Sequence, residues 1–405
     1  MYLKNILAFC IGVLLLVDFA FMQEYEKWPV VFRLPRMEDV EVRSVTFKTL
    51  GDGVQLKMYV FYPPDINHRS RLPAVIFHNC QSMDNIDYFL DYGKLIAASG
   101  MVGIIHQSRF FEKEDSGDLI DYISLHADEL SIDASQMGIW TASGNTMIGV
   151  PLALEKDKEY FRCAVVYYGM PDPETIDLLK PLRQDISLFI VRCGLDEFRA
   201  NRNIDYFVSE ALDADMDFEL VNYLTGHHAF DIADDNERSR EIIRRTLNFF
   251  RANLMERKKP EASIVFTSKK FHAMLRDGQI EETKTLFDKK LAEMQADQSN
   301  NPFFHREIWE RGMVLTAQQL LGEGKNKESA VVLQWMLEAY PHSPAAHLGA
   351  AEGFYDCGEV SLAIQIAEKA IELSHSSATL NEEQKKKLQE SAAEKIKKWK
   401  GAKAM

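Results

Sequence analysis

Two patterns of apolar and polar positions divide the chain. Up to about residue 254, short apolar runs of strand length alternate with segments of helical spacing, whereas the spacing is helical throughout from Ala262 onward. Strands that alternate with helices favour a mostly parallel sheet with right-handed crossovers. The pattern therefore predicts an α/β domain over 24–255 with helices on both faces of the sheet, followed by an all-α domain over 256–405.

The α/β domain opens with a predicted β-hairpin. Apolar and polar residues alternate on both sides of Gly51-Asp52-Gly53 within 40–63, which is the period of a half-buried strand around a tight turn. Most later runs are apolar throughout, which suits strands buried on both faces, and the segments between them include amphipathic helices. The predicted strands are 72–77, 101–106, 137–140, 163–168, 188–193 and 218–223, and the predicted helices are 86–99, 119–130 and 203–212.

One strand runs without a loop into a turn that carries a serine. The turn is Thr141-Ala142-Ser143-Gly144-Asn145, and a helix is predicted to begin near Thr146. It resembles the nucleophile elbow of α/β-hydrolases, in which the pattern G-x-S-x-G presents a serine on a sharp corner. Both outer glycines are replaced here, by Thr141 and Asn145. A serine that caps a helix N-terminus is the alternative interpretation.

An acid and a histidine follow later strands in the chain order of this family. Asp196 and Glu197 lie just past the strand 188–193, and Gly226-His227-His228-Ala229-Phe230 follows the strand 218–223. The Gly-x-His-Ala-Phe segment resembles the histidine loop of dienelactone-hydrolase-like enzymes, and serine, acid, histidine is the α/β-hydrolase order. The resemblance covers about 40–254. It implies Ser143 as nucleophile, Asp196 as acid and His228 as base, with Glu197 and His227 as competing choices.

The resemblance also implies an oxyanion hole. In α/β-hydrolases the N–H after the nucleophile and one from an earlier strand-end loop stabilise the oxyanion. Here these would come from Gly144 and from the loop His78-Asn79-Cys80-Gln81, which follows the strand 72–77. Gly144, His78, Asn79 and Cys80 are therefore the candidate oxyanion or substrate-binding residues. A capping or core role is the alternative for His78.

These residue types predict a serine hydrolase that acts on a carboxylic ester or related acyl bond. A serine hydroxyl becomes nucleophilic when an imidazole takes its proton, and a carboxylate stabilises the resulting imidazolium. The mechanism requires neither metal nor cofactor. No sizeable insertion separates Tyr168 from Leu188, which favours a small or surface-accessible substrate. The alternative function is a catalytically degenerate hydrolase that acts as a protein-binding scaffold.

The all-α domain resembles tetratricopeptide repeats. Within 344–373, Phe354 is the large residue of a first helix, Gly358 stands at the turn, and Ala363, Ala367 and Ala370 would pack closely on a second helix. An earlier copy places Ala330 33 residues before Ala363, and a weaker copy spans 271–294. A final helix is expected over 388–400. Stacked helical hairpins imply a groove for a protein or peptide partner, and a plain helical bundle is the alternative.

Charge, cysteine usage and the N-terminus complete the prediction. A net charge of −14 argues against a nucleic-acid partner, and five cysteines without paired spacing argue against a zinc site or disulfide framework. Residues 1–23 carry Lys4 before an apolar run, which is typical of a signal peptide or membrane anchor. The expected location is therefore exported, either periplasmic or membrane-anchored, with cleavage left open. A buried amphipathic helix is the alternative for this segment.

Overall fold

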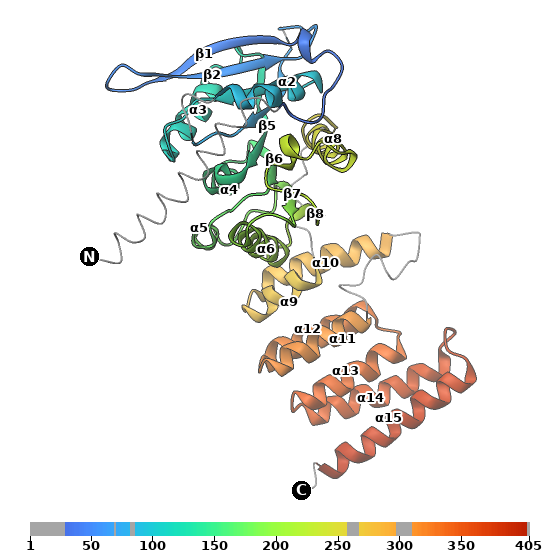
Figure 1. Cartoon of the computed structure of the whole chain (residues 1–405). Helices are drawn as coiled ribbons and strands as arrows, with labels where there is room; N and C mark the ends of the chain where they lie inside the picture. Colours follow the sequence, from blue (N-terminus) through green and yellow to red (C-terminus); the bar gives the residue numbers. More distant parts are fainter. Residues whose placement is uncertain (1–28, 69, 82–85, 257–266, 297–309, 403–405) are drawn as a thin grey trace. The chain divides into compact units, whose positions relative to one another are not determined.

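The structure, a computed structural model, describes residues 29–68, 70–81, 86–256, 267–296 and 310–402 (Figure 1). It divides into two compact units, one within 1–262 and one within 263–405. The predicted leader over 1–23 lies outside the described residues, so export stays a prediction. Among the described residues, no helix is both long enough and apolar enough to cross a membrane.

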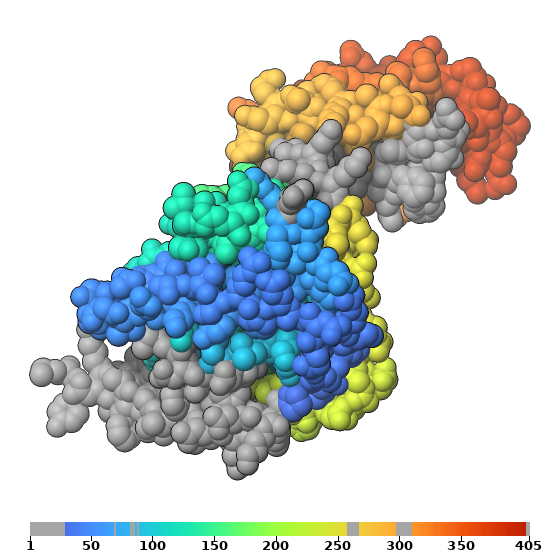
Figure 2. Space-filling model, turned by 90° about the horizontal axis from the view of Figure 1, so that it is seen from above, coloured from blue at the N-terminus to red at the C-terminus, as the bar shows by residue number. Residues whose placement is uncertain are grey.

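The first unit is built on one eight-stranded sheet. Its strand order is β1-β2-β4-β3-β5-β6-β7-β8. The pairs β1/β2 and β2/β4 are antiparallel, and all the others are parallel. The predicted hairpin and strands are all present, as β1 (Glu41–Thr49), β2 (Gln55–Tyr62), β3 (Leu72–Phe77), β4 (Val102–His106), β5 (Ile132–Ala142), β6 (Phe161–Tyr167), β7 (Ser187–Cys193) and β8 (Asp217–Tyr223). In the space-filling view, the blue β1–β2 hairpin lies at the surface (Figure 2).

Helices cover both faces of this sheet. The core on one face contains side chains of α3, α4, α5 and α6, and the core on the other contains side chains of α2 and α8. The bounds are α2 (Leu90–Ala98), α3 (Lys113–Leu125), α4 (Thr146–Leu154), α5 (Pro173–Leu178), α6 (Phe198–Asp213), α7 (Phe230–Ala233) and α8 (Glu237–Arg251). This two-faced, mostly parallel arrangement confirms the predicted α/β-hydrolase fold class.

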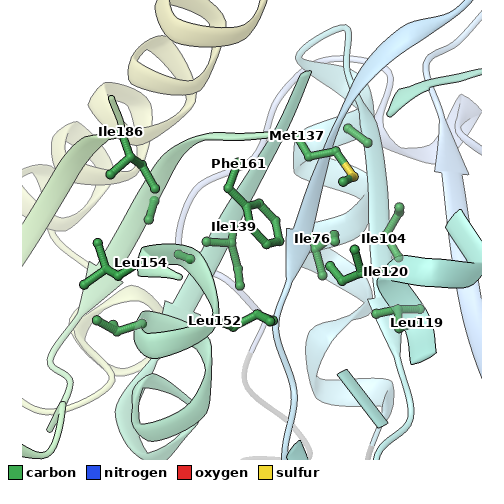
Figure 3. Close-up of a cluster of buried hydrophobic side chains, with 14 of the residues drawn as sticks. Ile76, Ile104, Leu119, Ile120, Met137, Ile139, Leu152, Leu154, Phe161 and Ile186 are labelled. Atoms are coloured by element: carbon green, nitrogen blue, oxygen red, sulfur yellow. The ribbon is translucent and has the colours of Figure 1, made fainter. Parts of the chain in front are cut away.

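Coverage of both faces explains why the central strands are apolar throughout. Successive residues of a strand point to opposite faces. In β3, Ile76 joins the core on the α3 and α4 side, whereas Phe77 joins the core on the α2 and α8 side. Figure 3 shows Ile76 and its parallel-strand neighbour Ile139 among the apolar side chains of the first core.

Three predicted helix starts and one predicted strand start were wrong by five residues or more. Helix α15 (Glu382–Ala402) begins six residues before the predicted start at 388. Helix α3 begins at Lys113 and ends at Leu125, instead of spanning 119–130, and α6 begins at Phe198 instead of 203. Strand β5 begins at Ile132, five residues before the predicted start. The early turn of α3 is polar, but tertiary contacts hold it, because buried Asp115 accepts hydrogen bonds from the Arg109 guanidinium. Apolar spacing carries no signal for such a turn.

The second unit consists of helices with a core of their own. Helices α9, α11 and α13 are followed by Gly278, Gly324 and Gly358. The φ values of these glycines are all positive, at 78°, 77° and 89° respectively. Glycine takes this backbone conformation without steric cost, so it ends helices efficiently. The helix bounds are α9 (Ser268–Arg276), α10 (Ile280–Ala296), α11 (Glu310–Gly322), α12 (Asn326–Ala339), α13 (Pro344–Asp356), α14 (Val360–Ser376) and α15 (Glu382–Ala402).

Candidate active site

Ser143 stands on a strained corner between β5 and α4. A short 3-10 turn, Ser143–Asn145, joins the two elements without a loop. The φ of Ser143 is 52°, a conformation that non-glycine residues adopt rarely and at an energetic cost. The residue before α4 is Asn145, so Ser143 does not cap that helix. The corner therefore has the geometry of a nucleophile elbow although both outer glycines are missing.

A glycine on the helix replaces the missing glycine of the strand. A methyl group at Gly149 would lie 2.8 Å from the Oγ1 of Thr141 and 3.1 Å from the Nδ1 of His78. Both distances are shorter than an ordinary van der Waals contact, so only glycine lets α4 approach β5 at this point. In the G-x-S-x-G pattern, glycines of the turn itself let the strand and the helix approach closely. Here the glycine that permits this approach lies in the helix, about one helical turn further along the chain.

Asn145, at the other altered position, connects the elbow to the loop after β3. Its side-chain Oδ1 accepts a hydrogen bond from the backbone N–H of Cys80 at 2.9 Å. Both residues are buried, and a buried N–H without a partner would be costly. Asn145 therefore holds the loop against the turn that carries Ser143.

The structure brings Ser143, His228 and Asp196 into one hydrogen-bonded chain. The Oγ of Ser143 lies 2.8 Å from the Nε2 of His228. The Nδ1 of the same ring lies 2.9 and 3.0 Å from the two carboxylate oxygens of Asp196. Because a carboxylate can only accept, the network assigns the ring proton to Nδ1 and leaves Nε2 to accept from the serine hydroxyl.

The three side chains of this hydrogen-bonded series differ in their exposure to solvent. The carboxyl-bearing side chain of Asp196 is 3% exposed, while the imidazole of His228 is 37% exposed, and Ser143 is partly exposed. The carboxylate of Asp196 is thus shielded from water, whereas the imidazole of His228 and the hydroxyl of Ser143 remain accessible.

The two competing residues lie elsewhere. The imidazole of His227 is 60% exposed, and its Nδ1 pairs with Asp234 at 2.8 Å. Glu197 contacts the acid only through its backbone N–H, which donates to Asp196 at 2.7 Å. The geometry therefore selects His228 over His227 and Asp196 over Glu197.

The loop after β3 carries three of the predicted oxyanion or substrate-binding residues. The side chains of His78, Asn79 and Cys80 are buried, so they do not face a substrate. Burial, followed by the neighbouring His106, holds the pKa of His78 well below its usual value, and burial raises the pKa of the Cys80 thiol to about 12. Both groups are therefore neutral at physiological pH, as core side chains usually are.

The backbone N–H groups of this loop are also occupied. His78 donates to the carbonyl of Trp140 at 2.8 Å, Asn79 to the Nε2 of His106 at 3.2 Å, and Gln81 to the Oδ1 of Asn79 at 3.0 Å. The remaining group, Cys80 N–H, donates to Asn145 as described above. A backbone N–H of this loop can therefore donate to an oxyanion, as predicted, only if one of these hydrogen bonds breaks.

Two residues next to the triad were not predicted from the sequence. The side-chain amide of Gln81 lies over Gly144, since a methyl group at Gly144 would be 2.3 Å from its Nε2. The ring of Tyr168 packs on the imidazole of His228, with 4.8 Å between ring centroids. The sequence signal for Tyr168 was its position at the end of β6, where active-site residues of parallel sheets gather.

A buried carboxylate supports Tyr168 from behind. Asp231 is fully buried and accepts hydrogen bonds from the hydroxyls of Tyr168 at 2.7 Å and Tyr92 at 2.6 Å. Burial raises the pKa of Asp231, although these two hydroxyls act in the opposite direction. The tyrosine that contacts His228 is thus fixed at both its ring and its hydroxyl.

Comparisons with known proteins add a limited resemblance. No protein-family model and no curated protein matches the chain. Among solved structures, it is similar to dipeptidyl peptidase 4 of Porphyromonas gingivalis, with 17% identity, a TM-score of 0.44, and coverage of 53% of this chain but only 36% of the peptidase. It is also similar to apo esterase 2 of Thermogutta terrifontis, with 18% identity, a TM-score of 0.42, and coverage of 55% and 96% of the two chains.

Proposed function

We propose that this protein is a serine hydrolase of the dienelactone-hydrolase-like type that cleaves a carboxylic ester or a related acyl bond. The observation that carries the proposal is the continuous chain from Ser143 through His228 to Asp196, with the serine on a strained elbow. Triads of this kind are recognised by geometry and by the role of each group. No metal or cofactor has a part in the mechanism.

In the first half of the reaction, the Oγ of Ser143 attacks the substrate carbonyl carbon while its proton passes to the Nε2 of His228. The imidazolium is stabilised by Asp196, which stays ionised. The tetrahedral oxyanion then collapses, the bond to the alcohol breaks, and His228 gives its proton to the leaving oxygen. An acyl group remains on Ser143.

In the second half, water takes the place of the alcohol. His228 removes one proton from the water as its oxygen attacks the acyl carbon, and returns that proton to Ser143 when the carboxylic acid leaves. The partial exposure of Ser143 and His228 gives this water a path. Only the six-residue helix α5 (Pro173–Leu178) lies between β6 and β7, which supports a small substrate over a long acyl chain.

The proposal is tested by labelling the purified full chain with a fluorophosphonate probe and locating the adduct by peptide mass spectrometry. Turnover of short-chain p-nitrophenyl esters is measured on the same sample. We expect both activities, with the adduct on the peptide that contains Ser143. If the chain is neither labelled nor active, the alternative of a degenerate hydrolase acting as a scaffold is favoured.

Asp196→Asn should lower kcat by about 10⁴-fold while the protein stays folded. An amide at this position can donate to Nδ1 of His228 and so favours the wrong ring tautomer. Glu197→Gln is the matched control, because that side chain is exposed and outside the network, and it should keep most of the activity. Ester kinetics and circular dichroism of both variants provide the measurement. A larger loss in Glu197→Gln would reverse the assignment of the acid.

We also propose that the second unit consists of tetratricopeptide-like repeats that dock a protein or peptide partner. Gly324 and Gly358 stand 34 positions apart with nearly equal φ values, and 34 residues is the period of this repeat. Phe354, Ala363 and Ala367 are buried between helices, as the repeat requires. These observations favour stacked hairpins over an irregular bundle.

Gly358→Ala should lower the free energy of unfolding of the second unit by about 1–2 kcal/mol, because alanine is strained at a φ of 89°. Gly322→Ala is the matched control, since Gly322 lies in α11 with open space where a Cβ would be added, and it should be neutral or slightly stabilising. Denaturant unfolding of both variants checks this. Ester turnover should be unchanged in both, and a loss of turnover in Gly358→Ala would contradict an accessory role for the repeats.

A further inference from the structure

The side-chain amide of Gln81 lies close to the backbone nitrogen that follows the nucleophile. Its Nε2 is 2.3 Å from the point that a methyl group on Gly144 would occupy. Within one residue, the backbone nitrogen and the Cβ position are about 2.5 Å apart. The Nε2 of Gln81 is therefore at most about 5 Å from the Gly144 nitrogen.

This separation fits two donors that share one acceptor. Donors of an oxyanion hole lie 2.7–3.1 Å from the oxyanion, so two of them are at most about 6 Å from each other. The Gln81 amide and the Gly144 N–H meet this limit. The backbone N–H groups of the loop 78–81, in contrast, already donate to acceptors inside the protein.

The backbone that carries Gln81 is held in place, and an aromatic ring lies near its amide. Its own backbone N–H donates to Asn79, and the preceding residue, Cys80, is fixed to Asn145 on the elbow. The ring of Phe111 reaches within 3.7 Å of the same methyl position at Gly144, and its backbone N–H donates to the Cys80 carbonyl at 2.7 Å. An apolar ring beside a donor excludes water, which strengthens the interaction with a developing charge.

The geometry points to Gln81 as a catalytic residue whose side-chain N–H donates to the oxyanion, together with the N–H of Gly144. This inference rests on the proposed serine-hydrolase function and names a donor for it. When Ser143 attacks the carbonyl, the electron pair of the C=O bond moves to the oxygen, and the Gln81 amide stabilises that negative charge without transferring a proton. It thereby replaces the loop backbone N–H that Asn145 holds.

Gln81→Ala should lower kcat for a p-nitrophenyl ester by about 10²–10³-fold with little change in KM, as expected for a donor that acts on the transition state. Gln81→Glu, which keeps the shape but replaces the amide donor with a charge, should be no more active. Gln136→Ala is the matched control, because the Gln136 amide binds only Asp133 in the first half of β5, and it should behave like the wild type.

A trifluoromethyl ketone distinguishes an oxyanion donor from a structural role. This inhibitor forms a tetrahedral adduct with an oxyanion on the serine, so its inhibition constant should rise in Gln81→Ala by about the factor by which kcat/KM falls. If Ser143 is labelled in the wild type but Gln81→Ala keeps its turnover and its affinity for the ketone, the inference fails and the proposed function stands. If the wild type is neither labelled nor active, the proposed function itself fails.

A double-mutant cycle between Gln81 and Gly144 tests whether the two residues are in contact. The methyl group of Gly144→Ala would displace the Gln81 amide, so this variant should also lose turnover. In a Gln81→Ala background the methyl group has room, and the same substitution should cost much less. Contacting residues show this kind of coupling. Independent, multiplicative losses in the cycle would overturn the contact on which the inference rests.

Discussion

Ser143→Ala should lower ester turnover by about 10⁶-fold and abolish fluorophosphonate labelling. The alanine lacks the oxygen that forms the acyl bond, and loss of the nucleophile alone removes nearly all of what a triad contributes. The residual rate would come from the oxyanion hole and substrate binding. Steady-state kinetics at high enzyme concentration, together with labelling, measure the two effects.

The loss should reflect chemistry and not unfolding. The Ser143 hydroxyl bonds to His228, and alanine and serine are both non-glycine residues at a φ of 52°, so the backbone strain is nearly the same in both proteins. Ser135→Ala is a matched control, because Ser135 is exposed and bonds only to nearby Asp133. Labelling that persists in Ser143→Ala would place the nucleophile elsewhere.

The sheet could be predicted from the sequence because burial on two faces leaves a strong signal. Residues 72–77 were predicted with the observed bounds of β3, since five of the six side chains in this strand contact a core on one face or the other. Helix starts were less predictable. The first turn of α6 carries Phe198, which is 79% exposed, and contributes only the small side chain of Ala200 to the buried face. Its apolar signal is therefore weak.

The part of the site that could be predicted consists of residues whose type and position at the end of a strand are themselves informative. Serine, acid and histidine each follow a strand, and their order along the chain was enough to bring Ser143, Asp196 and His228 together. The role of Asn145 was not predictable, because its partner, Cys80, is 65 positions away and the bond joins a side chain to a backbone N–H. Pairing at this range depends on the register of β3 against β5.

The amide of Gln81 illustrates the same limit. From the sequence, the loop after β3 was expected to supply a backbone donor, because that is what α/β-hydrolases generally use. Asparagine at position 145 changes this, since its carbonyl oxygen takes the N–H of Cys80 and leaves the next side chain over Gly144. The side chain at position 145 therefore bonds to a loop that is distant in sequence, and a motif at either position does not reveal this bond.

His228→Ala should lower turnover about as much as Ser143→Ala, whereas His227→Ala should keep most of the rate. The imidazole of His228 lies 2.8 Å from the Ser143 oxygen and also contacts Asp196, so its removal leaves the serine without a base. The imidazole of His227 is 60% exposed and pairs with Asp234. The two substitutions remove the same group from adjacent positions, which makes each the control for the other.

The double variant Ser143→Ala/His228→Ala decides whether the two residues act as one unit. If they do, it should be only slightly less active than either single variant, because the second substitution removes a group that no longer has a function. Independent contributions would instead multiply the two losses. Turnover of one p-nitrophenyl ester by all four proteins gives the comparison. A larger defect in His227→Ala than in His228→Ala would show that the neighbouring histidine is the base, and the hydrogen-bonded chain through Asp196 would then have no part in the reaction.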